Sequence, residues 1–207
     1  KELGSNVRLI TYIEPGIPTN LIGDQKRLIQ VLNNLLGNAV KFTKTGYIYL
    51  EVTQKRKSDA NTKLQFHVKD TGIGIDVSYL MALFEPFTQA DASIPRLYGG
   101  SGLGMNIAKK LVTLMGGKIW AESELDKGTS FFFNLETPYQ TLKDKHAFPD
   151  SLKGKVALLV NDCIESEKVY RHYLNYLGLT VDTVETAAEA LLRIKSPTTT
   201  KAKIDLI

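Results

Sequence analysis

Three glycines at alternate positions precede a predicted amphipathic helix in the segment LYGGSGLGMNIAKKLVTLMGG, residues 97–117. A glycine-rich loop that leads into a helix leaves backbone N–H groups and the positive end of the helix dipole exposed, and this arrangement suits a phosphate group. The spacing of Gly100, Gly102 and Gly104 matches neither the dinucleotide pattern G-x-G-x-x-G nor a Walker loop. The His-Arg-Asp and Asp-Phe-Gly signatures of eukaryotic-type protein kinases are also absent from the sequence. The segment therefore predicts phosphate binding by a different architecture. The apolar stripe expected on the helix consists of Leu103, Ile107, Leu111 and Leu114.

A second amphipathic helix is predicted to run to about Phe42, with Asp24 as its N-cap. Asn34, Asn38 and Lys41 lie within about 60° of one another beside its apolar face. Asparagine is unfavourable in the middle of a helix because its side chain competes for backbone hydrogen bonds. Two asparagines one turn apart beside the core therefore indicate either a bound ligand or the pairing of buried polar groups. The apolar face consists of Leu28, Val31, Leu32, Leu35 and Ala39.

The strand predicted in LQFHVKDTGIGI, residues 64–75, carries a carboxylate to the edge of the core. Asp70 follows the apolar residues at 64, 66 and 68 on the same strand face. A buried carboxylate needs hydrogen-bond donors, and an exocyclic amino group such as that of adenine would supply them. Gly72 and Gly74 would let the backbone approach a flat ligand. The alternative is an ordinary Asp-Thr-Gly turn at the end of a strand.

Composition excludes several other classes of protein. The 207 residues are 43% hydrophobic and 23% charged, which is typical of a globular chain. The net charge of +4 is spread along the sequence without a basic run, so nucleic acid is not an expected partner. The single cysteine, Cys163, excludes an internal disulfide and a cysteine-based zinc site. No apolar run approaches the ~18–20 residues that span a bilayer, and the first residues lack the apolar core of a signal peptide. A cytoplasmic location is expected, with any membrane attachment carried by other parts of a longer protein.

Changes in composition and periodicity along the chain predict two domains joined by a linker. Residues 1–138 alternate strand-like and helix-like segments with glycine-rich joints, residues 139–154 lose periodicity and are predicted to be a linker, and residues 155–207 begin a new pattern of strand, helix, strand and helix.

The first domain resembles the catalytic ATP-binding domain of sensor histidine kinases. The segments NLLGNAVKFT, DTGIGI, FEPF, GGSGLGM and DKGTSFFF occur in the order of the N box, first glycine box, F box, second glycine box and closing Gly-Thr strand of that family. The resemblance covers residues 1–138 and implies the GHKL superfamily with the Bergerat fold. That fold is a two-layer α/β sandwich in which helices cover one face of a mixed sheet. ATP and Mg²⁺ are the implied cofactors.

The resemblance also implies the roles of individual residues. Asn38 would hold Mg²⁺, Asp70 would accept a hydrogen bond from the adenine amino group, and the candidate catalytic residues are Asn34, Lys41 and Arg96, near the phosphates. The other implied nucleotide-binding residues are Gly72 and Gly74 along the base, Phe84 and Phe87 at the base of an ATP lid over residues 88–100, Gly100, Ser101, Gly102, Leu103 and Gly104 at the phosphates, and Thr129 near the adenine.

The implied reaction is transfer of the γ-phosphoryl group of ATP to a histidine on an upstream dimerisation domain that this chain lacks. GHKL members that hydrolyse ATP carry a glutamate at the position of Asn34, and an amide cannot activate water. His67, His146 and His172 lack the sequence context of a phosphoacceptor and are predicted to be structural or surface residues. The segment KELGSNVRLITYIEPGIP resembles the strand that follows the dimerisation helices.

Residues 155–207 resemble the first part of a flavodoxin-like receiver domain. Asn161 and Asp162 stand where receivers have two acids, and loss of the first acid weakens Mg²⁺ binding. The acceptor aspartate would follow the strand opened by KIDLI, so we expect a degenerate receiver used for docking or a truncated one. The whole pattern predicts part of a hybrid histidine kinase that dimerises through its missing helices and works with a receiver. The alternatives are a nucleotide-sensing module without catalysis, which Pro95, Leu97 and Asn161 leave open, and a GHKL ATPase.

Overall fold

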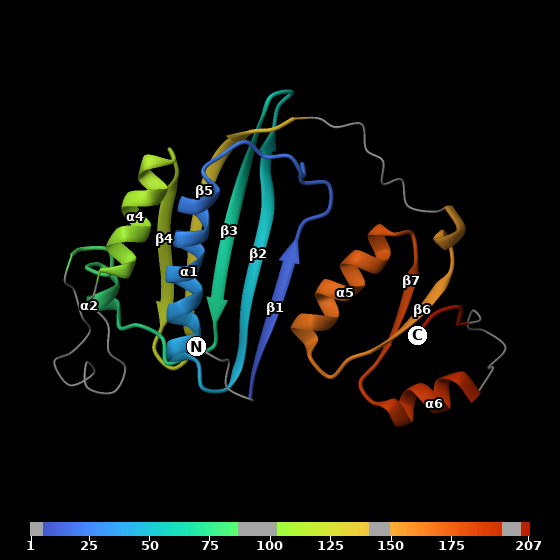
Figure 1. The fold of residues 1–207 in the computed structure, drawn as a ribbon. Helices are drawn as coiled ribbons and strands as arrows, with labels where there is room; N and C mark the ends of the chain where they lie inside the picture. The colour runs from blue at the N-terminus through green and yellow to red at the C-terminus, as the bar shows by residue number, and fades with distance from the viewer. Residues whose placement is uncertain (1–5, 87–102, 141–149, 196–203) are drawn as a thin grey trace. The chain divides into compact units, whose positions relative to one another are not determined.

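The chain divides into two compact units in a computed structural model, Lys1–Leu142 and Lys143–Ile207. The structure describes residues 6–86, 103–140, 150–195 and 204–207 (Figure 1). Within these ranges, no helix is both long enough and apolar enough to cross a membrane.

The first unit is built on a mixed five-stranded sheet in the order β1-β2-β3-β5-β4. Strands β1 and β2 are parallel, whereas the pairs β2–β3, β3–β5 and β4–β5 are antiparallel. Helices α1 and α4 lie over the same face of this sheet (Figure 1). The prediction of a mixed sheet with helices on one face is confirmed for this unit. The elements are β1 (Val7–Ile13), α1 (Gln25–Phe42), β2 (Gly46–Lys57), β3 (Asn61–Asp70), α2 (Val77–Leu80), α4 (Gly104–Leu114), β4 (Lys118–Glu124) and β5 (Gly128–Pro138).

Helix α1 begins and ends where its sequence predicts. The Asp24 carboxylate accepts a hydrogen bond from the Arg27 N–H at 3.0 Å, which satisfies one of the unpaired donors of the first turn. Val31, Leu35 and Ala39 are buried, and Leu28 and Leu32 pack against the same cluster at partial exposure. The 3.6-residue spacing therefore identifies the buried face correctly.

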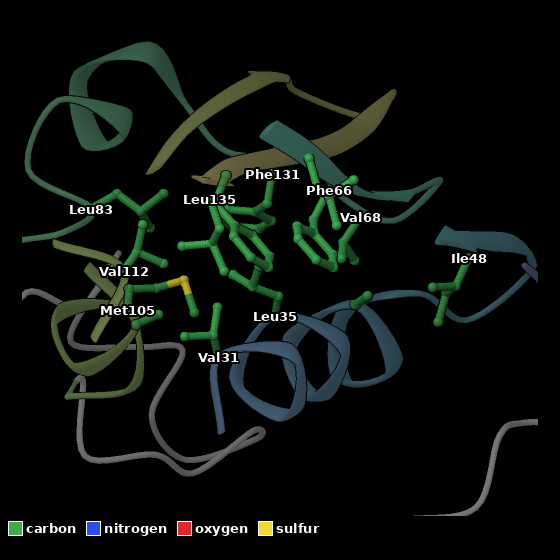
Figure 2. Packing of buried hydrophobic residues seen from close by; sticks show 14 residues of the cluster. Val31, Leu35, Ile48, Phe66, Val68, Leu83, Met105, Val112, Phe131 and Leu135 are labelled. Atoms are coloured by element: carbon green, nitrogen blue, oxygen red, sulfur yellow. The ribbon is translucent and has the colours of Figure 1, made fainter. Parts of the chain in front are cut away.

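The core of the first unit lies between this helical layer and the sheet (Figure 2). Phe66 of β3 and Phe133 of β5 are cross-strand partners, and their rings stack with centroids 4.4 Å apart. Leu35 and Val31 of α1 are fully buried against the cluster. Burial of each such side chain stabilises the fold by about 1.5–3 kcal/mol, so this cluster holds the N-box helix against the strand that carries Asp70.

The predicted apolar stripe of α4 is only partly correct, because Leu111 packs against the core cluster at partial exposure but is not the centre of the buried face. Met105, Ala108 and Val112 are its buried apolar residues, whereas Leu114 is 68% exposed. Two adjacent rows of apolar residues on this helix both follow helical spacing, so periodicity alone cannot choose between them. The buried row is the one that packs into the cluster formed by α1 and the sheet.

The second unit contains a parallel pair of strands with two helices. Strand β6 (Val156–Val160) pairs with β7 (Thr180–Val184). On its other edge, Ala157 forms a parallel bridge with Leu206. Strand β6 therefore lies between β7 and the segment that contains Leu206. The remaining elements are the short 3₁₀ helix η1 (Asp150–Leu152), α5 (Ile164–Tyr176) and α6 (Ala187–Lys195).

Candidate functional site

Three neighbouring strands of the first unit each carry a row of apolar side chains that faces the core. At the same end of the sheet, each of these rows finishes with a polar residue. Asp70 ends the row of β3 after Val68, and Thr129 begins that of β5 before Phe131. Ser123 ends the row of β4 and lies directly opposite Thr129. These three residues form a polar cluster at one end of the core, which we call the strand-end cluster.

Asp70 occupies the position that strand register predicts. It is only 4% exposed, and its Oδ1 accepts a hydrogen bond from the Gly72 N–H at 2.8 Å. Burial raises the pKa of the Asp70 carboxyl, while hydrogen bonds from the backbone N–H groups of Gly72 and Thr129 oppose that rise. Desolvation outweighs the donors that the protein supplies. A ligand that donates a further hydrogen bond would stabilise the ionised carboxylate.

The glycines that follow Asp70 are required by close backbone packing. A Cβ atom on Gly72 would lie 2.5 Å from the carbonyl oxygen of Phe42, at the end of α1. Gly74 has φ +70°, and its Cβ would lie 2.0 Å from the carbonyl oxygen of Glu124. The segment between β3 and α2 is therefore held against both α1 and the β4–β5 turn, which places its backbone beside the strand-end cluster.

The polar stripe of α1 contains a buried amide donor that none of the described residues pairs with. Asn34 Nδ2 has no hydrogen-bond partner within the described part of the chain, and such a group costs about 1–3 kcal/mol. Asn38 and Lys41 lie half-buried on the same helix, and Lys41 Nζ lies 4.6 Å from the centroid of the Phe42 ring. An amide donor, an amide oxygen and an ammonium group on one helix face fit a Mg²⁺-bound phosphate group.

The N-terminus of α4 lies next to this stripe. A Cβ atom on Gly104 would lie 3.8 Å from Asn34 Oδ1, so the N box and the second glycine box meet here. Leu103 is the N-cap, and its side chain makes no capping hydrogen bond. The first intrahelical bond runs from the Ile107 N–H to the Leu103 carbonyl at 2.9 Å. The N–H groups of a first helical turn have no partner within the helix, and in α4 this turn lies beside the Asn34 amide.

Asn106 is a buried polar residue of α4 that lies outside the residues predicted for the site. It is 8% exposed, and its Nδ2 donates to the carbonyl oxygen of Phe84 at 2.9 Å. This bond joins the F box, where Phe84 packs against the core at partial exposure, to the first turn of α4. An asparagine inside a helix beside apolar residues is the same signal that identifies Asn34 and Asn38. The predicted residues Phe87, Arg96, Gly100, Ser101 and Gly102 lie outside the described residues.

His67 lies on the other face of the sheet, as its register predicts. Its Nε2 is 3.1 Å from Ser130 Oγ and its Nδ1 is 3.6 Å from Glu51 Oε2. The hydrogen bond with His67 lowers the pKa of Glu51. This histidine is therefore engaged in contacts away from the strand-end cluster. His172 lies in α5, and His146 is outside the described residues.

Comparison with known proteins identifies the first unit. The family model described as "Histidine kinase-, DNA gyrase B-, and HSP90-like ATPase" matches residues 23–139. The chain belongs to this ATPase family. The match contains the whole strand-end cluster as well as Asn34 and Asn38 of α1, so these residues lie within the family's ATPase domain.

The similar proteins include histidine kinases and a hybrid signal transduction protein. The chain is 41% identical over 165 residues to the hybrid signal transduction protein dokA of Dictyostelium discoideum, which covers 78% of this chain and 9% of that protein. It is 35% identical over 206 residues to the peroxide stress-activated histidine kinase mak2 of Schizosaccharomyces pombe, covering 92% of this chain and 9% of that protein. A solved structure of full-length ShkA in complex with AMPPNP is similar over 90% of this chain and 37% of that one, with a TM-score of 0.71 and 26% identity. The chain thus carries a histidine-kinase-type ATPase domain and spans about a tenth of the length of the first two relatives.

Proposed function

We propose that this chain binds ATP with Mg²⁺ and transfers the γ-phosphoryl group to a histidine on a dimerisation domain outside the chain. The observation that carries the proposal is Asn34, whose buried Nδ2 has no partner within the described residues and whose amide lies beside the first turn of α4. An amide can donate to a phosphate oxygen but cannot take a proton from water. Asn34 therefore favours transfer to a stronger nucleophile over hydrolysis.

The residues of the chain supply binding, orientation and charge neutralisation. Asp70 would accept from the exocyclic amine of the base, with Thr129 beside it. The first-turn N–H groups of α4 and Lys41 would meet the negative charge of the phosphates. Asn38 would offer its amide oxygen to Mg²⁺, which neutralises phosphate charge when bound. In the transfer, the imidazole nitrogen forms a bond to the γ-phosphorus while the bridging P–O bond breaks, and ADP keeps that electron pair.

The second unit supports a further proposal, that it is the first part of a receiver-like domain. Strand β7 pairs with one edge of β6 and the bridge to Leu206 lies on the other edge. A third strand beginning at this bridge would give the order second, first, third that is found at the start of flavodoxin-like sheets. Asn161 follows β6, and its Oδ1 accepts from the Cys163 N–H at 2.8 Å, immediately before α5. An asparagine here gives a divalent cation a weaker ligand than a carboxylate. We therefore propose that this unit has a docking or regulatory role. We assign to none of its described residues the role of accepting a phosphoryl group.

Radiolabelled ATP tests the function directly. The full chain is mixed with Mg²⁺, [γ-³²P]ATP and a separate dimerisation fragment that carries the phosphoacceptor histidine of a hybrid kinase relative. We expect acid-labile label on the fragment. Released phosphate without labelled fragment would instead identify an ATPase, and ATP binding with neither product would identify a nucleotide-sensing module. Asn34→Glu is a useful companion variant, because a carboxylate at this position should increase phosphate release.

Asp70→Asn tests the recognition of the base. The amide would present an N–H group to the exocyclic amine of adenine, so we expect ATP affinity to fall about 10- to 100-fold, whereas GTP affinity changes little. Calorimetric titration of both nucleotides measures the change in their ratio. Asp126→Asn, at an exposed position in the β4–β5 turn, is the matched control. An ATP-to-GTP ratio equal to that of the parent would show that Asp70 is only a turn residue.

A further inference from the structure

One hydroxyl group connects the three segments that surround the strand-end cluster. Ser123 Oγ accepts a hydrogen bond from the Ile75 N–H at 2.8 Å. It also lies 2.9 Å from the carbonyl oxygen of Gly128 and 3.0 Å from Thr129 Oγ1. Ser123 therefore joins the end of the first glycine box to the beginning of β5 through a single atom.

The number of hydrogens on these groups determines the direction of each bond. A serine hydroxyl has one hydrogen to donate and two lone pairs with which to accept. The Gly128 carbonyl can only accept, so it receives the Ser123 hydrogen, and the Ile75 N–H can only donate. In the remaining bond, the Thr129 hydroxyl must therefore be the donor and Ser123 the acceptor. All bonding capacity of Ser123 is used in this arrangement.

The direction of the Thr129 hydroxyl changes what the strand-end cluster offers to a ligand. Once its hydrogen points to Ser123, Thr129 Oγ1 can only accept. The neighbouring Asp70 carboxylate, which already receives the N–H groups of Gly72 and Thr129, also accepts only. The two residues then match the two hydrogens of an exocyclic amine and disfavour a carbonyl oxygen in its place.

We propose that Ser123 is a positioning residue for base recognition, because it takes the Thr129 hydrogen and so leaves this end of the site with acceptors only. This inference rests on the proposed binding of ATP. Ser123 would act through Thr129 and Ile75 and would not itself touch the nucleotide. Without its hydroxyl, Thr129 could rotate to donate, and the site would better tolerate a purine with a carbonyl in place of the exocyclic amine.

Inosine triphosphate is the appropriate probe, because its base carries a carbonyl where adenine carries the amine. Affinities of the full chain for ATP and for ITP are measured by calorimetry with Mg²⁺. For Ser123→Ala, we expect ATP affinity to fall about 5- to 10-fold, while ITP affinity stays unchanged or rises, so that the ratio of ATP to ITP affinity narrows about 5-fold or more. Ser123→Thr keeps the hydroxyl and should retain the preference of the parent.

Two further variants separate positioning from a merely structural role. Ser130→Ala removes a hydroxyl from the same hairpin but on the opposite face, where it meets His67, and should leave both affinities unchanged. Thr129→Val removes the oriented hydroxyl itself and should narrow the preference as Ser123→Ala does. It also tests the proposal if Ser123→Ala fails to fold, as judged by circular dichroism.

Each result supports or overturns the proposal. Equal losses of ATP and ITP affinity in Ser123→Ala would show that Ser123 only maintains the local backbone. An unchanged preference in Ser123→Ala or in Thr129→Val would also overturn it. If the parent chain binds ATP and prefers it to ITP but the variants keep that preference, this inference alone fails. If the parent does not bind ATP, the proposed function fails and this inference fails with it.

Discussion

Asn38→Ala is expected to weaken Mg²⁺-dependent ATP binding strongly. Asn38 lies half-buried on the stripe of α1 that also carries Asn34 and Lys41, and alanine has no oxygen to offer a metal ion. Within the described residues, no group of three or more histidine, cysteine or acidic side chains could hold a metal ion. In the proposed site, Mg²⁺ would be held mainly by phosphates and water, as is common for this ion. Loss of its one protein ligand should weaken binding by about 100-fold, which is about 2.7 kcal/mol.

Titration with a non-hydrolysable ATP analogue, with and without Mg²⁺, measures this effect. Asn33→Ala is the matched control, since Asn33 is the exposed neighbour of Asn34 on the same helix. Alanine is a better helix former than asparagine by about 0.5 kcal/mol, so Asn38→Ala should unfold at the same temperature as the parent or slightly higher. Lost binding in a fully folded variant would therefore report on the site. Unchanged Mg²⁺-dependent affinity would remove Asn38 from it.

Local periodicity was sufficient to predict which side chains of β3 and α1 are buried. The two-residue alternation of β3 buries the side chains at 62, 64, 66, 68 and 70 in turn, so the register alone puts Asp70 at the end of the core. Helix α1 was equally predictable because its N-cap and its 3.6-residue spacing agree. Where a segment carries one clear pattern, the face it buries follows from the sequence.

The remaining errors and omissions have identifiable physical causes. Helix α4 has two apolar rows, and only its packing against α1 and the sheet selects the row that contains Ala108 and Val112. Ser123 was missed although β4 offers the same signal as β3, a core-facing row that ends in a polar residue. The roles of Gly72 and Gly74 depend on contacts with Phe42 and Glu124, which are distant in sequence. Such contacts between separate segments cannot be derived from local patterns.

Gly128→Ala is expected to destabilise the first unit strongly and to disrupt base recognition. Gly128 has φ +105°, a conformation that disfavours any residue with a Cβ atom, and that Cβ would lie 2.0 Å from the carbonyl oxygen of Asp70. Neither backbone can yield without separating β3 from β5 at the point where the Thr129 N–H meets the Asp70 carboxyl. We expect the free energy of unfolding to fall by about 3–5 kcal/mol, with loss of ATP affinity in the molecules that still fold.

Gly116→Ala separates the effect of backbone strain from that of the steric clash. Gly116 also has a positive φ of +77°, but a Cβ atom there would meet nothing within 4 Å. Its substitution should cost only the conformational penalty of about 1–2 kcal/mol and leave ATP affinity intact. Urea unfolding monitored by the fluorescence of Trp120 in β4 measures both variants on one scale. Equal losses of stability in the two variants would mean that the close approach of Gly128 to Asp70 does not hold the ends of β3 and β5 together. A larger loss in Gly128→Ala, together with lost ATP affinity, would show that recognition of the base depends on this backbone contact.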